Sequence, residues 1–439
     1  MMKKVVSALC LLLTFLLSGC SALSFEGTDI MCPPKATGNK AQIQKLIDKQ
    51  TSGNYTLKYP KNGTQRSSIV MHDIDNDEEE EAIAFYSDNE GECIHALFVE
   101  CTDGDYSVIS DEKFEAAGVD RIDFADINGD KSYEILIGYS TSTSSQNTLN
   151  IFFYDEEITK LEAAYNYSSL VTGDFNNDKT EDVLLISLFS GDVAAQAELM
   201  VYTTGGSLSE ISSVELDADV TALAATTYGQ ISYGTYGAVI DGITGAGDYT
   251  TQVVYFDPSI PSLLNPLYSY SGYSTTRRST QVCSLDFDKD ELIDIPVCSL
   301  MGYDSNEDTD TVSRKIDWSN LDTKSYYLDT IKSAIICVAD GYLLTMPSKW
   351  NGNVTARYDD KSRQTTVYVY EYVDGYLQKT NELVSIRAYS EEEFEKDDTG
   401  YIEFLRSGST VYAYSIGDAD NYLSITGDDI SSLFSLVNQ

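Results

Sequence analysis

Four nine-residue segments carry oxygen-bearing side chains at positions 1, 3, 5 and 9, and each can add a backbone carbonyl at position 7. Alternate side chains of a tight turn can point inward together, and a calcium ion takes about six to eight oxygen ligands. The candidate ligands are Asp73, Asp75, Asp77, Glu79 and Glu81; Asp126, Asn128, Asp130, Ser132 and Glu134; Asp174, Asn176, Asp178, Thr180 and Asp182; and Asp286, Asp288, Asp290, Leu292 and Asp294. The pattern predicts calcium binding at two or more of these loops.

The four loops are expected to differ in affinity, because ligand charge and rigidity set the affinity of such sites. The loops at Asp73 and Asp286 offer four carboxylates each, whereas Asn128 and Asn176 replace one carboxylate in the other two. The alternative interpretation is a set of metal-free turns held by hydrogen bonds from the backbone to the side chains. Repulsion among three or four crowded acids favours the metal-bound form.

Each loop leads directly into an apolar run, which indicates a buried β-strand. Position 12, counted from the first aspartate, is apolar in every copy and is occupied by Ala84, Ile137, Leu185 and Val297. An EF-hand loop would place a carboxylate at this position and would be flanked by helices. The helical calcium motifs are therefore excluded.

A loop that closes at position 9 and runs into a strand resembles the FG-GAP or VCBS repeat, the unit of the integrin α-subunit β-propeller and of many bacterial surface proteins. The loop of that family reads Asp-x-Asp/Asn-Gly-Asp-Gly-x-x-Asp, and the resemblance covers roughly residues 55–340. Glycine is kept at position 4 only as Gly129, and position 6 holds Glu78, Lys131, Lys179 and Glu291. These departures affect the expected metal affinity and not the expected fold. The fold that the resemblance implies is a β-propeller.

The spacing of the loops indicates a structural repeat. The first aspartates fall at 73, 126, 174 and 286, at intervals of 53, 48 and 112 residues, and 112 is twice 56. A period near 50 predicts four-stranded blades, with boundaries near residues 118, 168, 219 and 278. The doubled interval predicts a blade over about 219–266 that has lost its loop. Residues 238–245 occupy the corresponding position, where Asp241 alone survives, so no metal is expected there.

The amino terminus has the features of a signal peptide. Lys3 and Lys4 precede an apolar run over residues 5–17, and Leu-Ser-Gly-Cys follows at residues 17–20. This ending resembles the bacterial lipobox, which implies cleavage after residue 19, diacylation of Cys20 and attachment to the cell membrane on the side facing away from the cytoplasm. The alternative is an ordinary secretory signal with an incidental cysteine. Beyond this region, no stretch has the roughly eighteen apolar residues of a spanning helix.

The chain of 439 residues carries 29 basic and 70 acidic side chains, a formal net charge of −41. Removal of Lys3 and Lys4 with the signal peptide leaves 27 basic residues and a net charge of −43. So large an acidic excess excludes nucleic acid as a partner. It suits a soluble, self-repelling ectodomain that can supply carboxylates to cations.

The predicted organisation is a mainly β chain with four parts. A signal peptide (1–19) precedes an acylated tether and short helix (20–54), in which Ile43 and Ile47 have helical spacing. A β-propeller of five to seven FG-GAP/VCBS-type blades (55–340) and a small α+β domain (341–439) follow. A terminal helix from residue 429 is expected to present Ile430, Leu433, Phe434 and Val437 on one face. Alternatively, the first strands after residue 341 complete a further blade.

Few residues suggest catalysis. The two histidines, His72 and His95, have no second ligand at metal-site spacing and are interpreted as structural. The sequence contains no zinc-protease, phosphate-binding, nucleophile-elbow or dinucleotide motif. Most cysteines are interpreted as small buried hydrophobes, although Cys283 and Cys298 flank the fourth loop and can be cross-strand neighbours.

These features predict a lipid-anchored calcium-binding lipoprotein at the cell surface that acts as a binding or scaffolding module rather than as an enzyme. Its partners are expected to be the membrane, through the anchor, and an envelope protein or glycan. The alternative is a surface hydrolase that acts on polysaccharide or peptide, with its site on the central face of the propeller. Paired carboxylates do not distinguish the two, because acids are abundant throughout the chain.

Overall fold

The computed structural model describes residues 38–88, 93–142, 144–155, 157–268 and 274–437. Strands account for 54% of the described residues and helices for 8%, which confirms the mainly β class. The predicted signal peptide, Cys20 and the tether up to residue 37 lie outside the described residues. Among the helices that are described, none is long and apolar enough to cross a bilayer.

The described strands form six antiparallel sheets, each built largely from strands that are consecutive in the chain. The first sheet contains β1 (Tyr55–Leu57), β2 (Ile69–His72), β3 (Glu81–Asp88), β4 (Ile94–Thr102) and β5 (Asp105–Phe114). β1 and β2 pair with opposite ends of β3 and act as one interrupted first strand. The second sheet contains β6 (Gly118–Ala125), β7 (Glu134–Ser140), β8 (Asn147–Asp155), β9 (Glu157–Lys160) and β10 (Tyr165–Tyr167).

The third and fourth sheets have four strands each. The third contains β11 (Ser169–Gly173), β12 (Asp182–Ser187), β13 (Gln196–Thr203) and β14 (Ser207–Glu215). The fourth contains β15 (Val220–Ser232), β16 (Thr235–Thr244), β17 (Tyr249–Asp257) and β18 (Ser262–Leu264). Residues 118, 168, 219 and 278 therefore all fall at or between the ends of successive sheets, as the repeat period predicts.

The fifth sheet contains β19 (Ile295–Leu300), β20 (Arg314–Asp322), β21 (Tyr327–Cys337), β22 (Tyr342–Thr345) and β28 (Phe434–Leu436). The sixth contains β23 (Val354–Asp359), β24 (Gln364–Val373), β25 (Tyr376–Ser390), β26 (Ile402–Ser407) and β27 (Thr410–Ile416). Two 3-10 helices, η1 (Thr309–Thr311) and η2 (Ser348–Trp350), lie in the connections.

At the start of the carboxy-terminal segment, the structure follows the alternative expectation, in which the first strand after residue 341 completes a sheet of the preceding repeats. β22 pairs with β21, so the fifth sheet continues across the expected boundary at 340/341. Helix α4 spans Gly427–Leu433 and begins at a capping box between Thr426 and Asp429. The predicted terminal helix was expected to include Phe434 and Val437, but the observed helix ends at Leu433. Phe434 belongs to β28 and pairs with β22.

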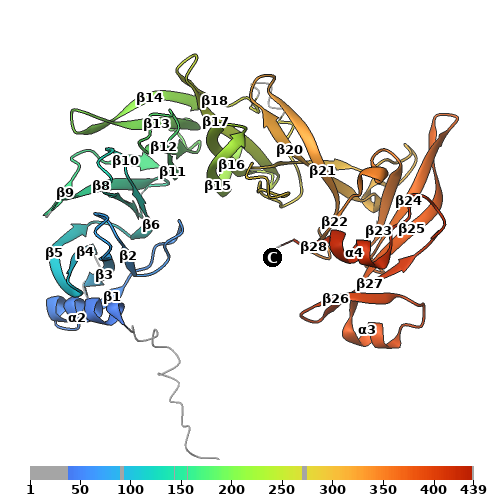
Figure 1. The fold of residues 1–439 in the computed structure, drawn as a ribbon, viewed down its shortest axis with the longest axis horizontal. Helices are drawn as coiled ribbons and strands as arrows, with labels where there is room; N and C mark the ends of the chain where they lie inside the picture. Colours follow the sequence, from blue (N-terminus) through green and yellow to red (C-terminus); the bar gives the residue numbers. More distant parts are fainter. Residues whose placement is uncertain (1–37, 89–92, 143, 156, 269–273, 438–439) are drawn as a thin grey trace, which may run out of the picture.

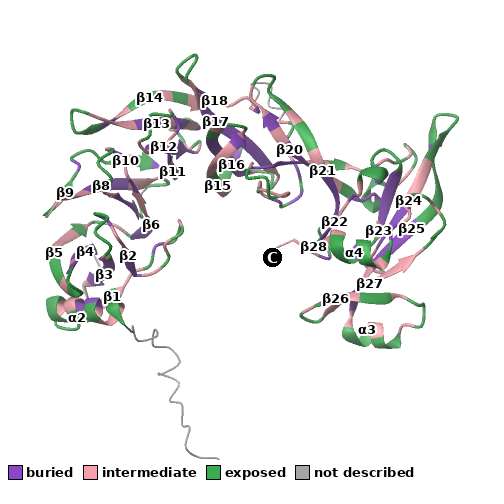
Figure 2. Cartoon of the chain, in the orientation of Figure 1, coloured by how far each residue is buried: buried purple, intermediate pink, exposed green. Residues whose placement is uncertain are grey.

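A hydrophobic core fills the space between successive sheets. Side chains of a strand alternate between its two faces, and in β3 both faces are buried. Ile83 and Phe85 join the core shared with the second sheet, whereas Ala82 and Ala84 join the core under helix α2 (Asn39–Thr51). Figure 2 shows buried residues concentrated in the central strands of the sheets. The near-continuous apolar runs after the loops are explained by this burial on both faces.

The six sheets follow one another along an open arc, with the first and sixth sheets at its ends (Figure 1). Helix α2 packs Ile43 and Ile47, both 0% exposed, on the first sheet, as their helical spacing predicts. Helix α3 (Glu391–Lys396) packs Phe394 on the sixth sheet. Each end sheet thus carries a helix on the face that is turned away from its neighbouring sheet.

Candidate metal-binding loops

The four loops occupy equivalent places in the first, second, third and fifth sheets. Three of them connect the first strand to the second: β2 to β3, β6 to β7 and β11 to β12. The fourth loop is closed by a bridge between Leu285 and Asp294 and leads into β19. Asp73, Asp126 and Asp174 each follow the first strand directly. The aspartates are therefore equivalent residues of one repeating unit, as the spacing predicts.

All four loops share one backbone conformation. Position 4 has a φ of 62° to 78° in Asn76, Gly129, Asn177 and Lys289, and position 6 has a φ of 73° to 82° in Glu78, Lys131, Lys179 and Glu291. Glycine adopts this left-handed region freely, whereas other residues meet steric repulsion. The geometry therefore requires a left-handed residue at both positions, and this chain meets the requirement with glycine only at Gly129.

Three hydrogen bonds recur in every loop. The carboxylate at position 1 accepts from the position-6 N–H at 3.0–3.1 Å. The carboxylate at position 5 accepts from the position-7 N–H at 2.8–2.9 Å. The carboxylate at position 9 accepts from the position-2 N–H at 2.8–3.0 Å. These bonds place the acidic side chains on the inner side of the turn, where they face one another.

The position-9 carboxyls are the most buried ligands of the set. Glu81, Glu134, Asp182 and Asp294 are between 0% and 2% exposed. Burial, together with the neighbouring carboxylates, raises the pKa of Glu81, Glu134 and Asp182 to about 7 and that of Asp294 to about 6. A cation among these acids would favour their ionised form, because opposite charge lowers the pKa of a carboxyl.

The first and fourth loops have the strongest arrangement for a cation. Carboxylate oxygens of Asp73, Asp75 and Glu81 lie within 4.8 Å of one another, as do those of Asp286, Asp288 and Asp290. In the fourth loop, Oδ1 of Asp288 and Oδ1 of Asp294 are buried and have no hydrogen-bond partner among the described residues. Unpaired buried oxygens are costly, and a hard cation would satisfy them.

The second and third loops differ from the other two, because the side-chain amide of an asparagine donates hydrogen bonds to two of their carboxylates. Nδ2 of Asn128 donates to Asp130 at 2.9 Å and to Glu134 at 2.7 Å. Nδ2 of Asn176 donates to Asp178 at 3.0 Å and to Asp182 at 3.3 Å. The amide would have to rotate to offer its oxygen to a cation. The two pairs of loops thus differ in geometry as well as in ligand charge, and the order of their affinities stays a prediction.

The interpretation of residues 238–245 as a degenerate loop is wrong. These residues lie in β16 and the turn after it, and the first turn of the fourth sheet falls at 232–235 instead. Asp241 forms a buried ion pair with Arg278 at 3.0 Å and accepts from Thr251 and Ser284. Gly242 is needed for strand packing, because a Cβ there would lie 2.6 Å from Val220.

The histidines make packing contacts, as expected. His72 stacks on Phe124 with ring centroids 4.1 Å apart, and burial lowers its pKa. His95 is 4% exposed and bonds Asp111 through Nδ1 at 2.9 Å. The described cysteines are free thiols, including the Cys283 and Cys298 pair that flanks the fourth loop. Cys32 lies outside the described residues.

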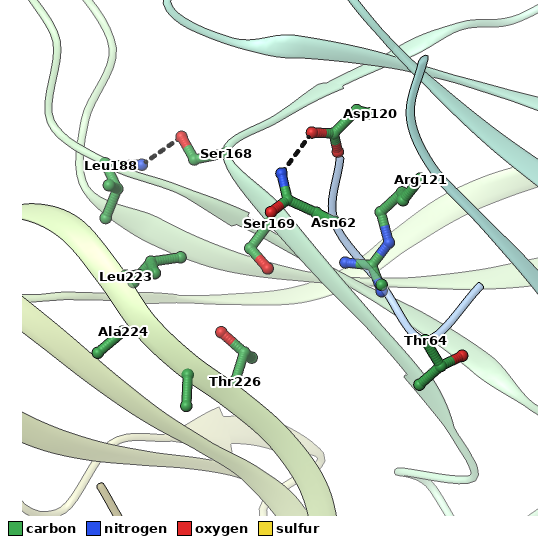
Figure 3. Close-up of a pocket in the computed structure, with 12 residues that line it drawn as sticks. Asn62, Thr64, Asp120, Arg121, Ser168, Ser169, Leu188, Leu223, Ala224 and Thr226 are labelled. Carbon is green, nitrogen blue, oxygen red and sulfur yellow. Dashed lines mark hydrogen bonds between the residues drawn. The ribbon is translucent and has the colours of Figure 1, made fainter. Parts of the chain in front are cut away.

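A polar pocket of about 470 Å³ lies beside the first strands of the second, third and fourth sheets. Hydroxyls of Ser169 and Thr226 and the guanidinium of Arg121 surround it (Figure 3). Asp120 accepts from Asn62 Nδ2 at 2.8 Å and from the Tyr167 hydroxyl at 2.6 Å. Sequence reasoning missed this pocket, because its residues come from separate repeats and form no local motif.

Comparison with known proteins identifies no relative by sequence: no family model matches the chain, and no curated protein matches it. Solved structures resemble it distantly, and two of them serve as examples. An exotype rhamnogalacturonan lyase has 12% identity and a TM-score of 0.30, with 72% of this chain and 63% of the lyase covered. A Bacteroides uniformis protein described as a 6-phosphogluconolactonase has 11% identity and a TM-score of 0.29, with 74% and 94% covered. Likeness at this level carries no argument about fold or activity.

Proposed function

We propose that this protein is a lipid-anchored, calcium-stabilised binding or scaffolding module, held on the membrane face turned away from the cytoplasm and built from FG-GAP/VCBS-type propeller blades. The observation that carries the proposal is the repetition of one loop in four sheets. The same three hydrogen bonds and the same two left-handed positions occur each time. A turn that only reversed the chain would not need three or four carboxylates, which repel one another without a cation.

The polar pocket supports binding more than hydrolysis. Glycoside hydrolysis by protein carboxyls usually needs two of them across the scissile bond. Among the described residues that line the pocket, Asp120 is the one carboxylate, and its oxygens are engaged by Asn62 and Tyr167. Neutral hydroxyl and amide groups supply most of the remaining polarity. The pocket therefore suits a polar group of an envelope protein or glycan as a ligand.

The calcium proposal is tested by thermal unfolding in EDTA and then in millimolar calcium. An ion that binds only the folded form stabilises it by about 2.7 kcal/mol per site at a hundredfold excess over the dissociation constant. Asp75→Asn and Asp288→Asn should each remove part of the calcium-induced rise in Tm. Glu371→Gln removes one exposed charge outside the loops and should leave the rise intact. A wild-type Tm that does not respond to calcium, with no bound metal by elemental analysis, would refute the proposal.

The anchor and the binding role need separate experiments. Cys20→Ser should abolish fatty-acid labelling and release the protein from the membrane fraction. Undiminished labelling of that variant would remove the anchor. Recovery of a specific envelope protein or glycan in a pull-down would support the binding role, whereas turnover in a hydrolase screen would favour the enzymatic alternative.

A further inference from the structure

Backbone hydrogen bonds join loops of neighbouring sheets at a repeated position. The residue at position 8 of the second, third and fourth loops donates its N–H to the preceding sheet. Tyr133 N bonds Ile74 O at 2.7 Å, Glu181 N bonds Asp126 O at 3.0 Å, and Ile293 N bonds Gln230 O at 2.9 Å. The first two acceptors lie inside the preceding metal loop, and the third lies in β15. The sheets are thus connected at the edge where the loops lie.

Side chains reinforce the same contacts. The amide of Asn76 in the first loop donates to Lys131 O in the second. Glu181 of the third loop accepts from Asp126 N at 2.9 Å. The Tyr228 hydroxyl in the fourth sheet donates to Asp174 O at 2.7 Å. A link of this kind therefore crosses each of the first three interfaces between sheets, and the Ile293 bond crosses the fourth.

Steric contact adds to the link between the second and third loops. A Cβ at Gly129 would lie 2.8 Å from Cγ2 of Thr180, which occupies position 7 of the third loop. The two turns are thus in close contact. Three of the backbone carbonyls that accept these bonds belong to Ile74, Asp126 and Asp174, which are either candidate ligands or lie between two of them. Fixing a loop around a cation also fixes the carbonyl that the following sheet contacts.

We infer that the loops are coupled in series, so that a cation in one loop strengthens the packing of the following sheet and the binding of a cation in the following loop. The inference rests on the proposed calcium binding and concerns its regulation. Coupling of this kind needs no large change in shape. The first cation orders the carbonyl acceptor, and the neighbouring loop then loses less freedom when it binds its own cation. Calcium would therefore stiffen the arc cooperatively.

Hydrogen–deuterium exchange of the full-length protein in EDTA and in calcium tests the coupling. In the wild type, calcium should slow exchange in peptides that contain Tyr133, Glu181 and Ile293. Asp75→Asn removes a ligand of the first loop only. It should raise the exchange rate at Tyr133, in the second loop, at least threefold in calcium, and it should leave Ile293 unchanged. Equal calcium protection of Tyr133 in the variant and the wild type would overturn the coupling while leaving calcium binding intact.

Glu181 provides an independent test, because its side chain contacts the second loop without belonging to it. Glu181→Ala should weaken calcium binding at the second loop about threefold or more, seen as loss of protection around Asp126. Glu181→Gln keeps an acceptor oxygen and should retain most of the calcium-induced protection around Asp126. Equal protection at Asp126 in the wild type and both variants contradicts the coupling. Absence of calcium protection anywhere in the wild type would refute the proposed calcium binding and the coupling together.

Discussion

At the scale of single residues, the loops keep a backbone conformation that glycine favours, although glycine itself occurs only at Gly129. Lys131 and Lys179 at position 6 have φ values of 82° and 78°. This left-handed conformation costs an ordinary residue roughly 1–2 kcal/mol. The same position is strained in every loop. The hydrogen bonds from the backbone to the carboxylates therefore hold the turn in this conformation despite its cost. Strain held at a repeated position is a mark of function rather than of accident.

Lys131→Gly should therefore increase the stability of the protein. Relief of the left-handed strain exceeds the entropic cost of glycine, and we expect a gain of roughly 0.5 kcal/mol in the free energy of unfolding. Urea unfolding in EDTA measures it. Lys113→Gly, at an exposed position in β5, is the matched control and should lose roughly 0.5–1 kcal/mol. An equal loss in both variants would show that position 6 is not strained.

The position-9 acids predict competition between protons and calcium. The pKa of Glu81 is about 7 in the metal-free protein, above its ordinary value. A raised folded-state pKa gives stability that is present at low pH and is lost as pH rises through about 7. In EDTA, Tm should therefore fall between pH 5 and pH 7, whereas the calcium-induced rise in Tm should grow over the same range. Glu81→Gln should flatten both trends, and a calcium effect independent of pH would contradict the assignment.

At the scale of elements, sequence reasoning succeeded where the signal was local. The ligand spacing and the apolar runs lie within one loop and one strand, so the four loops, the sheet boundaries and helix α2 could be predicted. The degenerate loop could not be placed by counting, because β15 has 13 residues and moves the turn to 232–235. Residues 238–245 were interpreted as a degenerate loop, yet Gly242 in this segment lies in β16 and packs closely against Val220. Phe434 shows how a short apolar run fits helix and strand equally well.

The helix on the first sheet supplies a prediction at this scale. Ile43 is 0% exposed and packs against the outer face of the sheet. Ile43→Ala should cost about 2–5 kcal/mol in the free energy of unfolding, because it leaves a cavity as well as losing apolar burial. Lys45 lies two residues further along helix α2, on its exposed side. Lys45→Ala should change the free energy of unfolding by less than about 0.5 kcal/mol. Urea unfolding distinguishes the two. A small effect of Ile43→Ala would show that the helix docks weakly.

At the scale of the whole molecule, charge opposes the compact state. A net charge of −41 produces long-range repulsion, which salt screens over a Debye length of about 8–10 Å at 0.10–0.15 M ionic strength. Raising sodium chloride from 50 to 500 mM should therefore raise Tm in EDTA. The rise should be smaller in saturating calcium, where bound cations already neutralise part of the acidic charge. A Tm that falls with salt in EDTA would contradict this account.

The helices at the two ends of the arc also govern whether copies of the molecule can join. In an array of stacked sheets, the last sheet would expose an apolar face that can bind another sheet unless it is capped. A head-to-tail contact of this kind that does not close into a ring leads to filaments. Helix α2 turns Gln42, Lys45 and Lys49 toward solvent and hides the apolar face beneath. A polar helix therefore covers this end of the arc. Removal of helix α2 should expose the apolar face beneath it and favour association between copies of the molecule.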